Sequence, residues 1–274
     1  RPIIIVWGEP NSIFFEIFLK TIKKYKNKKP LILIGSFKLF KDQIKKLKIK
    51  LNYKSFNLID KNLNNLLINK INFLNVEYKY KKPFEKISSN SNKYIMNCFI
   101  LAFKIIKQQK IAGLINGPIS KKYFLQKKFK GITEFISDHF KLDKYAMLIF
   151  NKSLSVLPVT THLPIEKVAK NLNKSSIISK SLLVNAFYRD FLFKKPKIAV
   201  CGLNPHCENF FKKISEEKKI INPAIKFLKQ KKISIDGPFP ADTIFLNNLR
   251  KKYDVIIGMY HDQVLTPIKS IHAF

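Results

Sequence analysis

The chain has 274 residues, of which 46% are hydrophobic and 13% aromatic, a composition that fits a folded protein with a large core and excludes a disordered one. No apolar run reaches the ~18 residues that a membrane span needs, and no secretory signal is visible. The net charge of +34 would suit a nucleic-acid binder, but only Arg1, Arg189 and Arg250 of the 52 basic residues are arginines, so we attribute the lysine excess to codon bias.

Buried strands and amphipathic helices alternate in the first half of the chain. Apolar runs predict strands at 2–7, 30–35, 71–77 and 111–116, and helical periodicity predicts helices at 12–25 and 89–110. The second half repeats the alternation, with strands predicted at 153–160, 196–202 and 253–260 and helices at 164–188 and 214–230. Short apolar runs between helices are typical of a mainly parallel sheet covered on both faces, so we expect an α/β fold.

Three of the five histidines lie just beyond predicted strands. His162 follows 153–160, His206 follows 196–202 and His261 follows 253–260. Ligands of parallel sheets bind beyond the carboxyl ends of the strands, and clustered imidazoles suit a divalent metal such as Zn²⁺. A histidine at a strand end is also often only a hydrogen-bonded turn residue, and the spacing alone leaves the two interpretations equally open.

Other polar residues fall near the same edge. Asp242 and Asp262 are carboxylates near this edge; Asp242 is either a helix cap, since it precedes "TIFLNNLR", or a carboxylate that orients a histidine. Lys121 and Lys269 are the lysines closest to strand ends, although position alone says little in so basic a chain. The three cysteines are too few and too scattered for a disulfide framework, which favours the cytoplasm.

Several motifs, taken in order, extend over most of the chain. They are "NGPISK" (116–121), "GITEF" (131–135), "THLP" (161–164), "GLNPH" (202–206), "GPFPADTIF" (237–245) and "YDVIIGMYHDQVLTPIK" (253–269). Together they resemble the 4-hydroxythreonine-4-phosphate dehydrogenase family of vitamin B6 biosynthesis. The set is specific, because "GLNPH", "PADT" and "YHDQ" in this order leave little room for another family.

The resemblance implies a two-lobed α/β/α fold like that of isocitrate and isopropylmalate dehydrogenases. Residues 1–125 would form the nucleotide-side lobe, to which 263–274 return. Residues 126–262 would form a second lobe with the metal ligands and the interface of a homodimer, whose active site lies between the subunits. A polar, basic stretch at 118–131 is the expected break between the lobes.

The resemblance also implies a reaction and a site. NAD or NADP would oxidise 4-phosphooxy-L-threonine, a small phosphorylated substrate, and decarboxylation would give 3-amino-2-oxopropyl phosphate. By matched position, the ligands of one divalent metal per subunit (Zn, Mn, Co or Mg) would be His162, His206 and His261. Substrate contacts would be Thr133, Lys269 and Lys121, and catalytic side chains would be Asp242, Asp262 and Lys269.

Three departures from the family pattern keep other functions open. Ile132 replaces a histidine of the family, Val264 replaces a glycine, and the sequence stops where the family continues with residues that complete the substrate and nucleotide sites. We therefore expect an incomplete nucleotide site and an exposed edge in the first lobe. The alternatives are a paralogous dehydrogenase for another phosphorylated hydroxy acid, a shortened member with weak or no activity, and a basic nucleic-acid binder on an unrelated fold.

Overall fold

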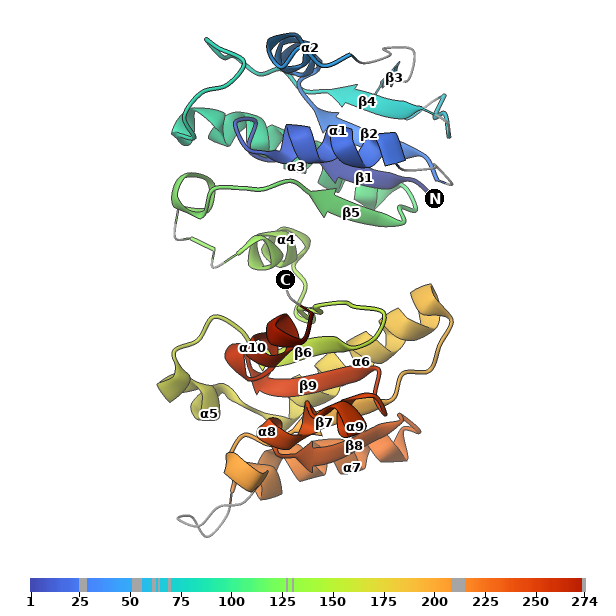
Figure 1. Cartoon of the computed structure of the whole chain (residues 1–274), viewed down its shortest axis with the longest axis vertical. Coiled ribbons are helices and arrows are strands. Elements are labelled where there is room, and N and C mark those ends of the chain that lie inside the picture. Colours follow the sequence, from blue (N-terminus) through green and yellow to red (C-terminus); the bar gives the residue numbers. More distant parts are fainter. Residues whose placement is uncertain are drawn as a thin grey trace. The chain divides into compact units, whose positions relative to one another are not determined.

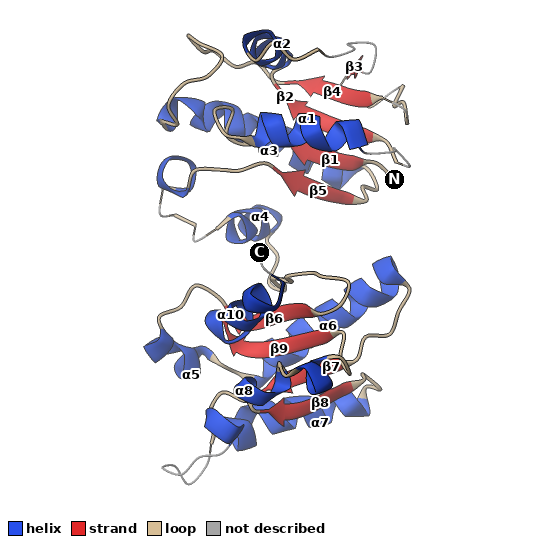
Figure 2. Ribbon diagram, viewed as in Figure 1, coloured by secondary structure: helices blue, strands red, loops and turns tan. Residues whose placement is uncertain are grey.

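The computed structural model describes residues 1–24, 29–50, 56–60, 63, 65–68, 70–126, 128–129, 131–207 and 215–272. The chain forms two compact units, Arg1–Ile132 and Thr133–Phe274. Each unit has a parallel β-sheet with helices packed against it (Figures 1 and 2). The predicted two-lobed α/β/α architecture is confirmed.

The first unit is built on a five-stranded parallel sheet. Its strands lie in the order β3 (Phe56–Ile59), β4 (Ile71–Asn75), β2 (Leu31–Gly35), β1 (Ile3–Val6) and β5 (Gly113–Asn116). The helices of this unit are α1 (Phe14–Lys24), α2 (Phe37–Lys46) and α3 (Asn92–Gln108), with the short helices η2 (Ser89–Ser91) and η3 (Lys121–Leu125). The core is aromatic: the ring of Trp7 stacks on Phe15 at 5.8 Å between centroids and meets Phe40 edge-on at 6.0 Å.

The second unit has a four-stranded parallel sheet in the order β6 (Ser155–Thr160), β9 (Val255–Tyr260), β7 (Ile198–Cys201) and β8 (Ile235–Phe239). Its longer helices are α4 (Ile132–Phe140), α6 (Lys174–Leu192), α7 (Asn222–Gln230) and α10 (His261–His272). Its shorter ones are α5 (Val168–Asn171), α8 (Ala241–Ile244), α9 (Asn247–Arg250), η4 (Ile165–Lys167), η5 (Pro205–Cys207) and η6 (Glu217–Ile221).

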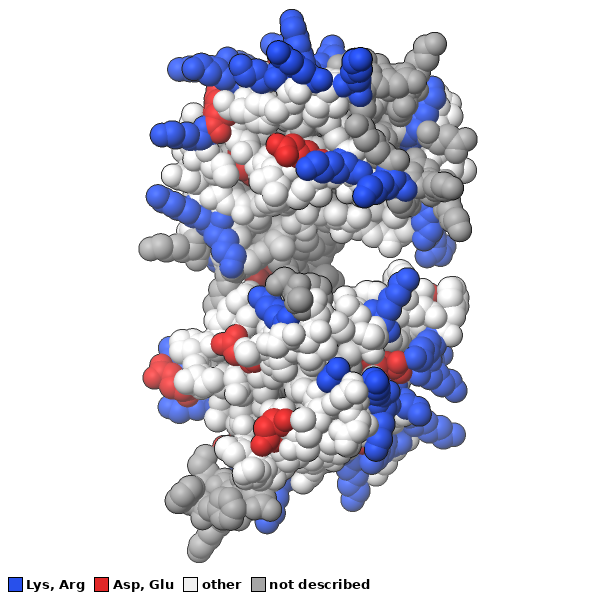
Figure 3. All heavy atoms as spheres, viewed as in Figure 1, with Lys and Arg blue, Asp and Glu red and all other residues white. Residues whose placement is uncertain are grey.

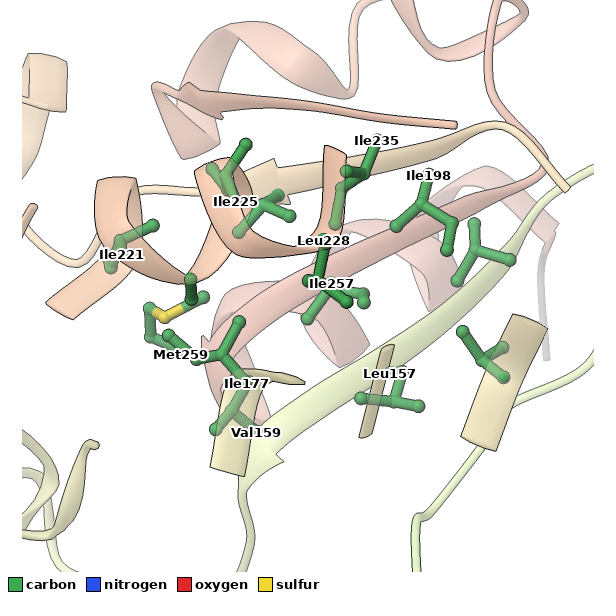
Figure 4. Close-up of a cluster of buried hydrophobic side chains, with 14 of the residues drawn as sticks. Leu157, Val159, Ile177, Ile198, Ile221, Ile225, Leu228, Ile235, Ile257 and Met259 are labelled. Atoms are coloured by element: carbon green, nitrogen blue, oxygen red, sulfur yellow. The ribbon is translucent and has the colours of Figure 1, made fainter. Parts of the chain in front are cut away.

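Alternation along the strands divides the core of the second unit into two layers. On one face, Leu157 and Ile257 pack with side chains of α6 and α7, such as Leu228 (Figure 4). On the other face, Val156 and Ile256 pack with side chains of α8 and α10. Because successive strand residues point to opposite faces, the apolar runs of β6 and β9 bury both sides of the sheet.

The division of the chain differs slightly from the predicted boundary at 125/126. In the sequence, the first unit ends at Ile132 and the second begins at Thr133, so the boundary falls within the "GITEF" stretch. Residues 263–272 were expected to return to the first lobe, but they lie in α10 of the second unit. The physical reason is burial: the apolar side chains of this segment pack in the core of the second unit, namely those of Val264, Leu265 and Ile268.

The structure also explains the valine that replaces a family glycine. Val264 lies inside α10 and is fully buried, so its position needs no backbone shape reserved for glycine. Space for its side chain comes from Gly258 in β9, where an added Cβ would lie 2.4 Å from Val264 Cγ1. The substitution is accommodated by packing within the second unit.

Positive charge is dispersed on the face seen in Figure 3. Lys and Arg side chains lie over both units with Asp and Glu among them. Dispersed lysines are the distribution expected of a compositional bias, and the absence of a nucleic-acid partner stays a prediction. None of the helices in the described ranges is long and apolar enough to cross a membrane.

In the first unit, the turn that follows β1 packs against the turn that follows β5, which leaves no room for a side chain at Gly117. A Cβ added at Gly117 would lie 1.9 Å from the carbonyl oxygen of Trp7, whereas a Cβ at Gly113 would meet nothing within 4 Å. We expect Gly117→Ala to lower the free energy of unfolding by about 1–3 kcal/mol, because the backbone of one turn must move away from the other. Urea denaturation measures the change. Gly113→Ala is the matched control and should be neutral or slightly stabilising; equal losses in both variants would contradict the prediction.

Candidate functional site

The three candidate histidines follow three neighbouring strands of the second sheet. His162 follows β6, His261 follows β9 and His206 follows β7, and these strands lie side by side in that order. All are parallel, and Thr160 of β6 pairs with Tyr260 of β9 at their carboxyl ends. The predicted placement at one sheet edge is therefore confirmed.

Two of the three imidazoles form a pair. The ring centroids of His162 and His261 are 6.0 Å apart, with 37° between the ring planes. Within the described ranges, no group of three His, Cys, Asp or Glu side chains is arranged to hold a metal ion. The structure thus brings His162 and His261 together and does not assemble the predicted trio with His206, whose role as a ligand stays a prediction.

A carboxylate contacts the Nδ1 atom of each paired histidine. Glu134 Oε1 lies 3.3 Å from His162 Nδ1, and Asp262 Oδ1 lies 2.6 Å from His261 Nδ1. An ionised carboxylate can only accept a hydrogen bond, so each Nδ1 carries the proton and each Nε2 keeps a free lone pair. Histidine ligands of metals are commonly held this way. In donor type and tautomer, the pair fits a divalent metal.

Two of the histidines have left-handed backbone conformations. His162 has φ 53° and His206 has φ 54°, in a region that histidine, like asparagine and aspartate, enters more often than most residues do. Other residues, such as Lys48 and Phe193, also have a positive φ, so the conformation by itself does not mark a functional site.

Gln263, the third residue of the His-Asp-Gln triplet, ties the ends of two strands together. Its buried Oε1 accepts from Met259 N at 2.6 Å, and its Nε2 donates to Gly202 O at 2.8 Å. Met259 belongs to β9 and Gly202 directly follows β7. The amide therefore fixes the relative positions of the strands that lead to His261 and His206.

Glu217 fixes the turn that leads to His206. Its Oε1 accepts from the backbone N–H groups of Leu203 and Asn204, both at 2.8 Å, and its Oε2 accepts from Asn204 Nδ2 at 2.9 Å. Burial by itself raises the pKa of the Glu217 carboxyl, but the hydrogen bonds outweigh burial and hold that pKa below its ordinary value. Residues 208–214, which follow this turn, lie outside the described residues.

Lys180 adds a positive charge near Glu134. Its Nζ donates to the carbonyl oxygen of Tyr145 at 3.3 Å. Burial lowers the pKa of Lys180, and the negative charge of Glu134 opposes that change. The second carboxylate oxygen of Glu134, Oε2, is buried and has no hydrogen-bond partner among the described residues.

Of the remaining predicted site residues, Thr133 lies next to a residue that contacts the histidine pair, and the others lie on other elements. Thr133 directly precedes Glu134 on α4. Lys269 is exposed on α10, eight residues after His261 and so about 12 Å along the helix. Asp242 is exposed in the first turn of α8 and accepts from Thr243 Oγ1 at 2.9 Å. Lys121 begins η3 in the first unit.

Sequence reasoning missed Glu134, Gln263 and Glu217 as parts of this site. Gln263 belongs to the motif "YHDQ", which by itself indicates no role for the amide. Glu134 and Glu217 reach the site from helices that no spacing rule connects to a histidine. In a single sequence, a carboxylate 28 residues away from its partner gives no signal.

Comparisons with known proteins agree with one another. The sequence profile of a family described as pyridoxal phosphate biosynthetic protein PdxA matches residues 26–274. A 4-hydroxythreonine-4-phosphate dehydrogenase from Sulfurihydrogenibium sp. (strain YO3AOP1) is 34% identical over 271 residues, covering 97% of this chain and 82% of that protein. Another from Aquifex aeolicus (strain VF5) is 32% identical over 277 residues, covering 99% and 83%.

Solved structures support the same fold. The crystal structure of 4-hydroxythreonine-4-phosphate dehydrogenase from Klebsiella pneumoniae matches with a TM-score of 0.82 at 24% sequence identity. The match covers 99% of this chain and 85% of that chain. At this identity the likeness establishes the fold of both units.

Proposed function

The chain belongs to the pyridoxal phosphate biosynthetic protein PdxA family, and we propose that it is a 4-hydroxythreonine-4-phosphate dehydrogenase. The substrate would be 4-phosphooxy-L-threonine, oxidised at its hydroxyl-bearing carbon and decarboxylated to 3-amino-2-oxopropyl phosphate. The observation that carries the proposal is the pair His162 and His261, each with a carboxylate on Nδ1, at the carboxyl edge of the sheet.

The paired imidazoles would hold a divalent metal through Nε2, with His206 as the proposed third ligand. When bound, such a metal lowers the pKa of a coordinated hydroxyl and stabilises negative charge left by departing CO₂. Glu134 and Asp262 hold the Nδ1 protons and so keep both rings in the ligand tautomer. Zn, Mn, Co and Mg are the candidate metals, with Zn the best match to imidazole donors.

Substrate binding falls to polar residues around the pair. Thr133, next to Glu134 on α4, offers a hydroxyl donor for the phosphate or carboxylate end. Lys269 and Lys121 would supply positive charge to the phosphate, and Lys269 with Asp242 completes the proposed catalytic set. The extra positive charge of the chain would help to attract a phosphorylated substrate.

A dehydrogenase of this kind needs a hydride acceptor, for which we propose NAD or NADP on the first unit. The carboxyl edge of the first sheet supports this placement, because close-packed glycine turns after β1 and β5 meet there. We also propose a homodimer, supported by exposed apolar residues along and just after α6, among them Leu182, Phe191 and Phe193 at 40%, 60% and 91% exposure. Cysteines that form no disulfide support the cytoplasm as the setting.

An activity assay tests the proposal. Purified chain, stripped with a chelator, should form NADH or NADPH from 4-phosphooxy-L-threonine only after Zn²⁺, Mn²⁺, Co²⁺ or Mg²⁺ is restored. The amino ketone phosphate and CO₂ should appear in equal amounts with the reduced nucleotide. Turnover that is insensitive to chelation would contradict the metal role, and no turnover at all would favour the inactive alternative.

One substitution favours a second candidate function. Ile132, where the family has histidine, begins α4 directly before Thr133 and cannot donate a hydrogen bond. Because Ile132 offers the substrate no side-chain hydrogen bond, the chain would instead be a dehydrogenase whose substrate is another phosphorylated hydroxy acid, one with fewer polar groups. A panel of such acids in the same assay decides between the two, and the substrate with the higher kcat/KM identifies the function.

A further inference from the structure

Glu134 differs from every other carboxylate near the histidine pair. It lies in the first turn of α4, and its contact with His162 joins two elements that are separated in the sequence. Its side chain is 20% exposed, whereas that of Asp262, which contacts His261, is 78% exposed. The Glu134 contact is longer, at 3.3 Å against 2.6 Å for Asp262, but water competes less for a carboxylate that is less exposed.

The contact selects one form of the imidazole. Neutral histidine carries its single proton on either Nδ1 or Nε2, and only the bare nitrogen can bind a metal. With Glu134 Oε1 at 3.3 Å from Nδ1, the proton belongs on Nδ1 and the lone pair on Nε2.

Lys180 lies near Glu134 without a direct contact to it. Its Nζ donates to the carbonyl oxygen of Tyr145, and the negative charge of Glu134 acts on it through space. The Oε2 of Glu134 is buried and has no hydrogen-bond partner among the described residues, so its contact with His162 is made through Oε1.

We propose that Glu134 is a positioning residue that holds His162 in the Nδ1–H tautomer and so presents Nε2 as a metal ligand. The metal-binding part rests on the proposed function, whereas the tautomer itself is a property of the metal-free chain. Glu134 touches neither substrate nor cofactor in this role; it acts through His162.

The test uses Glu134→Ala, with Glu134→Gln as the conservative variant that keeps an acceptor oxygen. The matched control is Glu166→Ala, which removes the same charge from an exposed position four residues after His162. Nitrogen-15 NMR of the metal-free imidazoles, assigned with His162→Ala, reports the tautomer. Titration calorimetry with Zn²⁺ reports affinity, and circular dichroism checks that each variant is folded.

In the wild type and in Glu166→Ala, His162 should be the Nδ1–H tautomer. In Glu134→Ala it should shift toward Nε2–H, and Zn²⁺ affinity should fall about 10–100-fold, with Glu134→Gln in between. An unchanged tautomer in folded Glu134→Ala would overturn the role of Glu134, as would an unchanged Zn²⁺ affinity. If the wild type binds no Zn²⁺, the metal part of the proposed function fails, and the tautomer shift still confirms or overturns the role of Glu134.

Discussion

His261→Ala should abolish dehydrogenase activity and weaken Zn²⁺ binding by more than about 100-fold, the upper range for loss of an outer-shell partner. His261 follows the central strand of the three that lead to histidines, and its ring is 6.0 Å from that of His162. Alanine would remove a proposed ligand nitrogen and leave the contact between Glu134 and His162 intact. Chelator-stripped protein is titrated with Zn²⁺ by calorimetry, and initial rates are measured with saturating metal.

His272→Ala is the matched control for this variant. His272 ends the same helix, and its Nε2 lies 3.4 Å from Ser153 Oγ, away from the histidine pair. Its replacement should leave Zn²⁺ affinity and rate near the wild-type values. If His261→Ala binds Zn²⁺ as tightly as His272→Ala does, the pair is not a metal site and the proposed mechanism is wrong.

Glu217→Ala should lower the free energy of unfolding by about 2–4 kcal/mol, because three donors near the His206 turn lose their acceptor. The loss should stay below the sum for three isolated donors, since Leu203 and Asn204 are only half-buried and water can replace part of the carboxylate. Urea denaturation gives the value. Glu216→Ala is the comparison: its carboxylate accepts from Asn204 Nδ2 at 3.1 Å, holds neither backbone N–H group of the turn that Glu217 holds, and is less buried than Glu217, so its loss should be smaller.

The same carboxylate should make stability depend on pH. Hydrogen bonds lower the pKa of Glu217 in the folded chain, so its contribution is present above the ordinary glutamate pKa of about 4.3 and is lost as the pH falls through the folded value. Melting temperatures of the wild type and Glu217→Gln should therefore converge below about pH 4. A gap that stays constant from neutral to acidic pH would show that the ionised carboxylate is not what holds the turn.

Most of the fold could be predicted because its strands are short apolar runs with helical segments between them. The elements that were not predicted include β3, α2, α4, β8 and α10. Strand β8 contains Gly237 and Pro238, which an edge strand of a sheet tolerates. Helix α10 contains Pro267 in its interior and still continues to His272.

Only the parts of the candidate site that directly follow strands could be predicted from the sequence. The rule that ligands gather at the carboxyl ends of parallel strands identified His162 and His261 correctly as neighbours. It could not identify Glu134, which reaches His162 from a helix outside the sheet. Nor could it place Lys269 at a stated distance from the pair, because the position of a side chain two helical turns away depends on how α10 packs.

The order of strands in the second sheet has a consequence for how this unit is made. Strand β9 lies between β6 and β7, yet the ribosome synthesises it after both of them and after β8. Until Val255 and its neighbours emerge, β6 and β7 have no partner between them, and each presents open backbone groups. The sheet can therefore be completed only after β9 has been made. Pairing of β9 with β6 and β7 joins segments that are distant in the sequence, so it is slow and leaves the incomplete unit prone to aggregation. This strand order therefore exposes the second unit to aggregation while it is being synthesised, before β9 joins β6 and β7.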